Sequence, residues 1–209
     1  MKKVIVYGAG EFGSLITNVM SYHSDLNIVA YVDDDSNKIG QLIDGVPILC
    51  NEDILKFTQN NGIEYAISSI GNNKIRAEKY TLLKNKGFQM LSIIHPQALI
   101  DTKVTYGDNV IIEMGTAIHT NSNIGNNVFL GGDALIGHHN IIGNHVLVGG
   151  NVSFGGSVIV EDYVSIGVGS SIKPGVRLGE GAVIGVGAAV VNDVKPGDVV
   201  VGVPAKPIK

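Results

Sequence analysis

Four histidines that could take part in acid–base chemistry lie close together in the sequence: His119, His138, His139 and His145. A neutral imidazole is a suitable general base near pH 7. His138 could take a proton from an amine or hydroxyl, and the adjacent His139 could orient it or contact the substrate. The alternative is that both are exposed side chains without a chemical role. No metal site is predicted, because structural zinc sites usually contain Cys, none is nearby, and adjacent residues of an extended strand point apart.

Glycines at fixed spacing after a strand form a second chemical signature. The segment Gly8-Ala9-Gly10-Glu11-Phe12-Gly13 joins an apolar strand to a helical pattern. This GxGxxG arrangement lets backbone N–H groups and a helix N-terminus approach an anionic phosphate. Asp33 follows the next strand, about 20 residues later, where such folds place an acid that contacts a ribose hydroxyl. The predicted substrate-binding residues are Gly8, Gly10, Gly13, Asp33, Asp34 and Asn72. The alternative is a glycine turn that holds no ligand.

Strands and helices alternate around these residues over positions 1–95. Apolar runs predict buried strands at 3–7, 28–32, 48–49, 65–70 and 89–94, and helices are predicted after residue 13, at 51–60 and at 74–86. We interpret this order as a small half-Rossmann domain, βαβαβαβ, with an open parallel sheet. The domain is too small to bind a complete dinucleotide, so a mononucleotide-sized ligand suits it better. An NAD-dependent reductase is the alternative that this size disfavours.

A six-residue period runs from Ile100 to Val194. The first position of each hexad is apolar, apart from the amphipathic Tyr106, and the fifth is nearly always small or β-branched. The period fits neither an α-helix nor a hairpin sheet, but it fits a parallel β-helix in which three hexads form one triangular coil. Residues three hexads apart should then stack, and the segment predicts about five coils. The expected fold class is therefore α/β plus all-β.

Composition limits the partners and the location of the protein. The chain has 209 residues, a net charge of −4 and no run of Lys or Arg, so nucleic acid is not a predicted partner. The single Cys50 excludes an intramolecular disulfide and fits a reducing compartment. No apolar stretch approaches the roughly 18 residues of a membrane span. The short apolar run after Lys3 does not fit a signal peptide. The expected location is the cytoplasm.

Several motifs occur in a characteristic order: Gly8-Ala9-Gly10-Glu11-Phe12-Gly13, Val32-Asp33-Asp34-Asp35, Gly45-Val46-Pro47, Ile94-His95-Pro96, the hexads, and Gly202-Val203-Pro204-Ala205-Lys206. This order resembles that of the bacterial sugar acetyltransferases of the NeuD/PglD type. The resemblance implies a left-handed β-helix, a homotrimer, and acetyl-CoA as the acyl donor to a sugar or nucleotide sugar. It also implies that residues 1–95 bind the UDP part of a UDP-amino sugar, and that residues 96–209 form the acetyltransferase domain with a C-terminal tail.

The resemblance assigns the catalytic base to His138, because the family's histidine is the third residue of a hexad and Ile136-Gly137-His138 matches that position. Three features of the family are replaced here. His139 stands where an acid usually follows the base, Gly131 replaces an upstream Asn, and Leu147 replaces a second histidine. His139 is therefore the second predicted catalytic residue, and Asp133 is our candidate for a carboxylate that arrives from elsewhere.

The resemblance also predicts where coenzyme A would bind. In the family it lies along the groove between two prisms and is held largely by backbone groups of later coils. Gly156 should stack on His138 and leave room for the pantetheine arm, and Lys206 could meet a phosphate. An exposed terminal lysine without a ligand is the alternative for Lys206.

These inferences favour an acetyl-CoA-dependent N-acetyltransferase that acts on a nucleotide-linked, UDP-type amino sugar in surface-glycan biosynthesis. The acceptor would attack the acetyl carbonyl directly with His138 as base, since no Cys lies in the hexads to form an acyl-enzyme. The alternatives are O-acetylation of a sialic-acid-like sugar and a non-catalytic scaffold. The sequence leaves open the sugar, the ring position and the acyl group.

Overall fold

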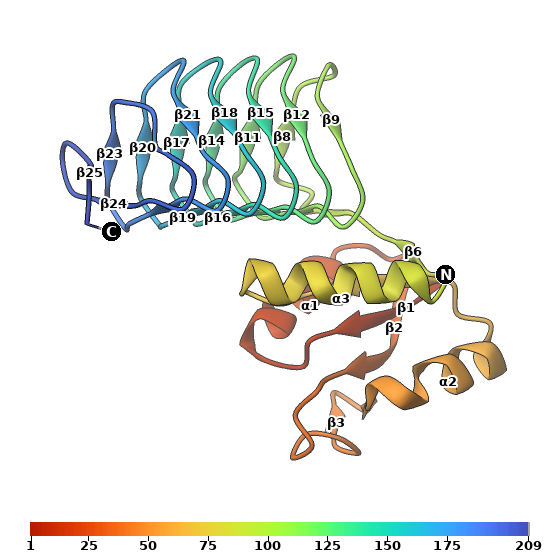
Figure 1. Cartoon of the computed structure of the whole chain (residues 1–209). Helices are drawn as coiled ribbons and strands as arrows, with labels where there is room; N and C mark the ends of the chain where they lie inside the picture. Colours follow the sequence, from red (N-terminus) through yellow and green to blue (C-terminus); the bar gives the residue numbers. More distant parts are fainter. Residues whose placement is uncertain (209) are drawn as a thin grey trace. The chain divides into compact units, whose positions relative to one another are not determined.

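The computed structural model describes residues 1–208 and contains two compact units, Met1–Ser92 and Ile93–Lys209 (Figure 1). The predicted fold class is confirmed: a small α/β domain precedes a left-handed parallel β-helix. The division after Ser92 precedes the one expected after His95, because Ile93 and Ile94 pair with the β-helix. Within residues 1–208, no helix combines the length and the apolar character needed to cross a bilayer.

The first unit is built on a six-stranded sheet with the order β3-β4-β2-β1-β5-β6. Every pairing is parallel except that of β3 with β4. Val4, Ile5 and Val6 are fully buried in the central strand, as expected for a parallel sheet covered on both faces. The elements are β1 (Lys2–Tyr7), α1 (Glu11–Ser21), β2 (Leu26–Val32), β3 (Leu42–Ile43), β4 (Val46–Leu49), a 3-10 turn (Asn51–Asp53), α2 (Ile54–Asn61), β5 (Tyr65–Ser68), α3 (Asn73–Asn85) and β6 (Gln89–Met90).

The structure corrects four of the predicted element bounds. The strand predicted at 89–94 is two strands, since β6 ends at Met90 and residues 93–94 belong to the β-helix. The strand predicted at 65–70 ends at Ser68, where the chain turns toward α3. The helix predicted at 51–60 begins as a 3-10 turn. The short strand predicted at 48–49 is the end of a hairpin, β3–β4, whose turn residues Asp44 and Gly45 both have positive φ.

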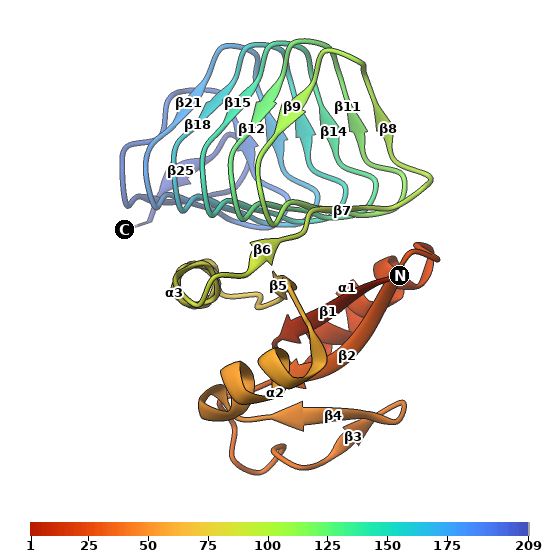
Figure 2. The ribbon, with the colours of Figure 1, turned by 90° about the vertical axis from the view of Figure 1, so that its right-hand side faces the viewer.

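The second unit is a three-sided prism whose coils stack along one axis (Figures 1 and 2). The first face contains β7 (Ile93–Ile94), β10 (Ile111–Ile112), β13 (Phe129–Leu130), β16 (Leu147–Val148), β19 (Ser165–Ile166), β22 (Val183–Ile184), β24 (Val199–Val201) and β25 (Lys206–Pro207). The second contains β8 (Leu99–Ile100), β11 (Ala117–Ile118), β14 (Leu135–Ile136), β17 (Ser153–Phe154), β20 (Ser171–Ile172) and β23 (Ala189–Val190). The third contains β9 (Thr105–Tyr106), β12 (Asn123–Ile124), β15 (Ile141–Ile142), β18 (Ile159–Val160) and β21 (Arg177–Leu178).

The predicted hexad positions fill the core of the prism. Every first-position residue from Ile112 to Val190 is buried, and so is every fifth-position residue from Val110 to Val194. At the open first coil the first-position Tyr106 is 44% exposed, so the prediction that first-position residues are buried fails there. The strands pair with those three hexads away, as predicted, and this stacking fixes which residues meet at each corner.

Candidate active site and nucleotide pocket

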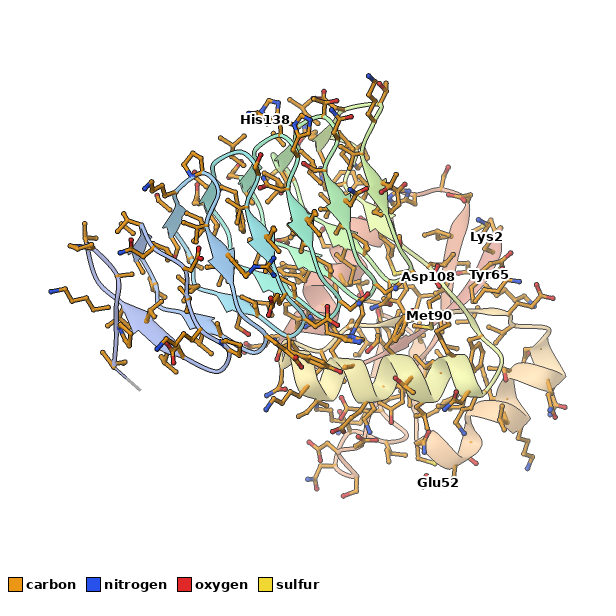
Figure 3. All side chains as sticks on the ribbon, turned by 45° about the horizontal axis from the view of Figure 1, so that its top comes forward. Lys2, Glu52, Tyr65, Met90, Asp108 and His138 are labelled. Atoms are coloured by element: carbon orange, nitrogen blue, oxygen red, sulfur yellow. The ribbon has the colours of Figure 1, made fainter. Side chains whose placement is uncertain are left out.

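His138 and His139 lie on the corner between β14 and β15, and both are exposed. Figure 3 shows His138 on this corner. The corner turns because the residue at the fourth hexad position adopts a left-handed backbone, with φ of 59° at His139 and 58° at Asn121, one coil earlier. The corner is bonded to both neighbouring coils: His139 N–H donates to the Thr120 carbonyl, and Ser157 N–H donates to the His138 carbonyl. The backbone that carries the two histidines is therefore held in place.

The two imidazole rings contact each other edge to face. Nδ1 of His138 lies 3.0 Å from Nδ1 of His139, with the ring planes at 85°. Nε2 of His139 lies 3.2 Å from Nδ2 of the Asn121 side-chain amide. His139 thus contacts His138 at the position where the resemblance places an acid. Sequence analysis did not identify Asn121, although the three-hexad period places it beside His139.

Gly156 stacks on His138, as predicted, and the structure adds a reason for its lack of a side chain. A Cβ at this position would lie 2.7 Å from Nε2 of His138, which is closer than atoms can pack. The glycine therefore makes room for the imidazole itself. The predicted contact of Gly156 with a pantetheine arm stays a proposal.

Two buried polar residues at fifth hexad positions support the same corner from inside. Asn140 Nδ2 donates to the carbonyls of Gly137 (2.7 Å) and Gly155 (3.1 Å), and its Oδ1 accepts from Val158 N–H at 2.6 Å. Ser122 Oγ donates to the same Gly137 carbonyl. These bonds satisfy backbone groups that would otherwise be buried without partners, and they fix the backbone leading into His138.

Asp133 and Glu113 are two prism carboxylates that lie away from the His138 corner. Asp133 sits beside Gly115 on the corner between β13 and β14, so within one chain it does not orient His138. Glu113 accepts a hydrogen bond from Gly132 N–H at 2.9 Å, and burial raises the pKa of its carboxyl despite that bond and the nearby His95. Asp133 stays a candidate only as a contribution from a second copy.

The remaining prism histidines have other surroundings. His95 is buried, and its Nδ1 accepts from Gln97 N–H. His119 lies 3.9 Å from Asp101, and His145 stacks on Tyr163. Across residues 1–208, no three His, Cys, Asp or Glu side chains are grouped to hold a metal ion.

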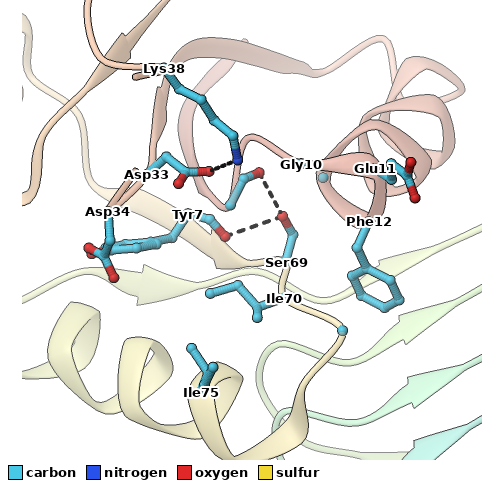
Figure 4. A pocket seen from close by; sticks show the side chains of 13 residues that line it. Tyr7, Gly10, Glu11, Phe12, Asp33, Asp34, Lys38, Ser69, Ile70 and Ile75 are labelled. Atoms are coloured by element: carbon cyan, nitrogen blue, oxygen red, sulfur yellow. Dashed lines mark hydrogen bonds and ion pairs between the residues drawn. The ribbon is translucent and has the colours of Figure 1, made fainter. Parts of the chain in front are cut away.

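In the first unit, the turn between β1 and α1 borders an open pocket of about 310 Å³ (Figure 4). Five of the six predicted substrate-binding residues line it: Gly8, Gly10, Gly13, Asp33 and Asp34. The sixth, Asn72, does not; its side-chain oxygen caps α3 by accepting from the N–H groups of Lys74 and Ile75. Sequence analysis missed Tyr7, Lys38 and Ser69, which also line the pocket.

The three glycines have different surroundings. Gly8 has φ of 116°, and a Cβ on Gly13 would lie 3.1 Å from the Gly8 carbonyl carbon, so both are needed for the tight turn. Gly10 faces open space, since the nearest atom to an added Cβ is Lys38 Nζ at 3.9 Å. It immediately precedes α1, whose first-turn N–H groups cannot bond within the helix. The motif therefore presents an open, positively polarised helix end beside a lysine.

Asp33 is bound into the turn through both of its oxygens. Oδ2 accepts from Ala9 N–H (2.9 Å) and Lys38 Nζ (3.0 Å), and Oδ1 accepts from Asp35 N–H. Burial acts to raise the pKa of this carboxyl, but the bonds from Asp35, Lys38 and Ala9 outweigh it and lower the pKa. Asp33 is thus an ionised carboxylate that orders the turn and holds Lys38 near Gly10.

Asp34 is the more accessible of the two acids, with 55% of its side chain exposed against 14% for Asp33. Its carboxylate accepts from Tyr7 OH at 2.6 Å and pairs with Lys79, whose Nζ also lies over the Tyr7 ring. Burial, followed by the bond to Asp34, raises the pKa of Tyr7, so its hydroxyl remains a donor. Asp34 is available to accept from a ligand hydroxyl.

A buried arginine supports the far edge of the pocket. Arg76 is 1% exposed, and its guanidinium donates to the Ile70 carbonyl at 3.0 Å. Burial lowers the pKa of Arg76 to about 10, which leaves it protonated at neutral pH. It therefore fixes the loop of Ile70 and Gly71 against which a ligand would rest.

Lys206 lies in the C-terminal tail, where β25 pairs antiparallel with β24. Its partner in the register is Val201, and its side chain is exposed. The structure thus anchors the backbone of the tail to the first face of the prism. The predicted phosphate contact stays a proposal.

Residues 3–83 match the family model of the PglD N-terminal domain. The whole chain is similar to PerB from Caulobacter crescentus, solved in complex with CoA and GDP-perosamine, with a TM-score of 0.93, 26% identity, and coverage of 100% of this chain and 98% of that one. WeeI from Acinetobacter baumannii AYE gives a TM-score of 0.91 and 26% identity with both chains covered completely.

The acetyltransferase domain of PglB from Neisseria gonorrhoeae FA1090, solved in complex with acetyl coenzyme A, shares the fold. It gives a TM-score of 0.88 and 22% identity, and 99% of each chain is covered. The comparison with curated protein sequences gave no match. Residues 3–83 are therefore similar to the PglD N-terminal domain, and the resemblance of the whole chain to the sugar acetyltransferases of the NeuD/PglD type is confirmed.

Proposed function

We propose that this protein transfers the acetyl group of acetyl-CoA to the amino group of a nucleotide-linked amino sugar. The enzyme class, an acyltransferase, and acetyl-CoA as donor agree with the comparisons, since PerB covers the whole chain and was solved with CoA and GDP-perosamine. The observation that carries the proposal is a chain with both required parts: a pocket at a glycine-rich turn and a histidine pair on a β-helix corner.

The pocket of the first unit suits a nucleoside diphosphate. The N-terminus of α1, the open space at Gly10 and the ammonium of Lys38 together favour an anionic diphosphate. Asp34 can accept from a ribose hydroxyl or from an N–H of the base. We keep uridine as the proposed base, although PerB was solved with a guanine nucleotide.

In the proposed reaction His138 is the general base. The acceptor nitrogen attacks the thioester carbonyl, a C–N bond forms, and Nε2 of His138 takes the proton from that nitrogen. When the tetrahedral intermediate collapses, the C–S bond breaks, and the coenzyme A thiolate leaves and takes up the proton. The reaction needs no acyl-enzyme intermediate, because the acceptor amine attacks the thioester directly.

The finer parts of the prediction belong to this proposal. They are a homotrimer, a cytoplasmic location, a role in surface-glycan synthesis, and coenzyme A contacts at Gly156 and Lys206. O-acetylation of a sialic-acid-like sugar would use the same base on a hydroxyl. A non-catalytic scaffold would keep the prism without turnover.

A thiol-release assay tests the proposal. Acetyl-CoA is supplied with UDP-, GDP- and dTDP-linked amino sugars, with the corresponding hydroxyl sugars as controls, and the free coenzyme A thiol is measured. We expect release with an amino sugar and a loss of about 10²–10⁴ in kcat for His138→Ala. Release with hydroxyl sugars alone would favour O-acetylation. Full activity of His138→Ala would contradict the assignment of the base.

A further inference from the structure

The contacts of His139 impose a condition on the chemistry of His138. The two Nδ1 atoms lie 3.0 Å apart, so a single hydrogen must lie between them. A neutral imidazole carries one N–H, on either Nδ1 or Nε2. If His138 supplies the hydrogen from Nδ1, its Nε2 is a lone pair and can act as base. If His139 supplies it, His138 carries its proton on Nε2 and cannot.

The partner on the far side of His139 decides between these two states. Where His138 donates from Nδ1, the Nδ1 of His139 accepts, so its remaining hydrogen is on Nε2 and needs an acceptor. The group within reach of that Nε2 is the side-chain amide of Asn121, whose Nδ2 lies 3.2 Å away in the structure. The amide can offer either its oxygen as acceptor or its nitrogen as donor, because rotation about χ2 exchanges the two.

We propose that Asn121 is a positioning residue that sets the tautomer of His138 through His139. With the Asn121 oxygen toward His139, each hydrogen points from His138 to His139 to Asn121, and Nε2 of His138 is free to accept a proton. With the nitrogen toward His139, which is the orientation in the structure, the direction reverses and the base is blocked until the amide rotates about χ2. An amide thereby replaces the acid that orients the base in related enzymes, without adding a negative charge.

The fold supports this arrangement. Asn121 and His139 occupy the same fourth hexad position in successive coils, both with a left-handed backbone, so their side chains leave the corner in register. Asn is among the residues that adopt this conformation most readily. His139 N–H is bonded to the Thr120 carbonyl, which holds the spacing between the two coils.

The inference rests on the proposed role of His138, and its test has a readout independent of turnover. The ¹⁵N chemical shifts of the histidine rings report which nitrogen of His138 carries the proton. Two variants are compared with the parent protein. Asn121→Gly keeps the left-handed backbone and removes the amide. Asn121→Asp offers only acceptor oxygens, so it enforces N–H on Nε2 of His139.

We expect Asn121→Asp to keep His138 in the Nδ1–H form with kcat equal to or above that of the parent. Asn121→Gly should raise the Nε2–H fraction and lower kcat on the order of tenfold, less than the 10²–10⁴ that a base contributes. Asn151→Gly is the matched control, since Asn151 has φ of 56° at the same hexad position on another corner, and it should leave both readouts unchanged.

Identical His138 spectra in the parent, Asn121→Gly and Asn121→Asp would overturn the inference. So would a selective loss of activity in Asn121→Asp with His138 held in the Nε2–H form. Full activity of His138→Ala would instead remove the proposed base, while the spectra would still show whether Asn121 controls the tautomer. The two failures are therefore distinguishable.

Discussion

At the residue scale, the site depends on a small set of contacts that the hexad period brings together. The imidazole of His138 lies over Gly156 on one side and against His139 on the other. The position of His138, its stacking on Gly156 and its exposure could be predicted from the period. The geometry between His138 and His139 could not, because adjacent residues usually diverge and the left-handed turn at His139 is what brings the rings into contact.

The first prediction concerns Gly156. In Gly156→Ala the new methyl group would overlap the His138 ring, and the exposed ring can move aside without unfolding the prism. We expect kcat to fall by about 10-fold or more, as for a misplaced general base, with little change in melting temperature. Steady-state kinetics measures kcat, and scanning calorimetry measures the melting temperature. The control is the same substitution in the His138→Ala background, where it should have no further effect. An additional loss there would mean that Gly156 acts on something other than His138.

A second prediction concerns pH and Glu113. Burial raises the pKa of this carboxyl above its ordinary value of 4.5, so the unfolded chain releases the proton first as pH rises. The contribution of Glu113 to the free energy of unfolding should therefore be greatest below pH 4.5. It should be lost as the pH rises through the raised pKa of the folded state. The Glu113→Gln side chain can still accept from Gly132 N–H, and because it does not ionise, its stability should not fall over this pH range. Urea unfolding at several pH values should show the two stabilities diverging; parallel curves would contradict the prediction.

At the element scale, the same corner is held from inside by Asn140. The hexad pattern predicted a small or β-branched residue at this position, and the polar exception could have been recognised as a site of backbone bonding. Asn140→Val keeps the volume typical of fifth positions but removes three hydrogen bonds to buried backbone groups. We expect a loss of about 2–4 kcal/mol in the free energy of unfolding, since each unsatisfied buried group costs about 1–3 kcal/mol. A free energy of unfolding of Asn140→Val equal to that of the parent protein would contradict the account.

Two glycines of the β1–α1 turn provide a matched pair of substitutions that tests the pocket of the first unit. Gly13→Ala would place a methyl group against the Gly8 backbone, whereas Gly10→Ala meets only open space. We expect Gly13→Ala to destabilise the first unit by about 2 kcal/mol or more through overpacking. Gly10→Ala should retain stability and lower the affinity for a UDP or GDP probe about tenfold, because its methyl group fills the space a phosphate would use. Scanning calorimetry measures the stability of each variant, and titration calorimetry measures its affinity for the nucleotide. Unaltered binding by Gly10→Ala would place the ligand elsewhere.

The glycines and Asp33 of this turn were predicted because the strand–turn–helix geometry fixes them along the sequence. The basic residues were not, since Lys38 and Lys79 come from a loop and a helix whose approach depends on the packing of the whole sheet. Asn72 was assigned to the pocket because it follows a strand end. The structure shows that a residue at this point can serve equally as a helix cap.

At the scale of the whole molecule, the faces on either side of the His138 corner leave apolar side chains uncovered. Leu135 on β14 is 41% exposed and Ile141 on β15 is 49% exposed, and both belong to regularly paired strands. Exposed apolar side chains of this kind, repeated along flat faces, are typical of surfaces that pack against another chain. Because these residues flank the corner, packing of a second prism there would enclose His138 from one side.

The last prediction is therefore a homotrimer in which three prisms cover these faces. Light scattering should give about 66 kDa, three times the 22.0-kDa chain. The double variant Leu135→Glu and Ile141→Glu would place carboxylates in the packed interface, so it should lower the mass toward that of one chain and reduce turnover with it. Leu42→Glu is the control, since Leu42 is equally apolar and 65% exposed but lies in the β3–β4 hairpin of the first unit. A mass near 22 kDa for the parent protein would refute the trimer, and a double variant that stays trimeric would place the interface on other faces of the prism.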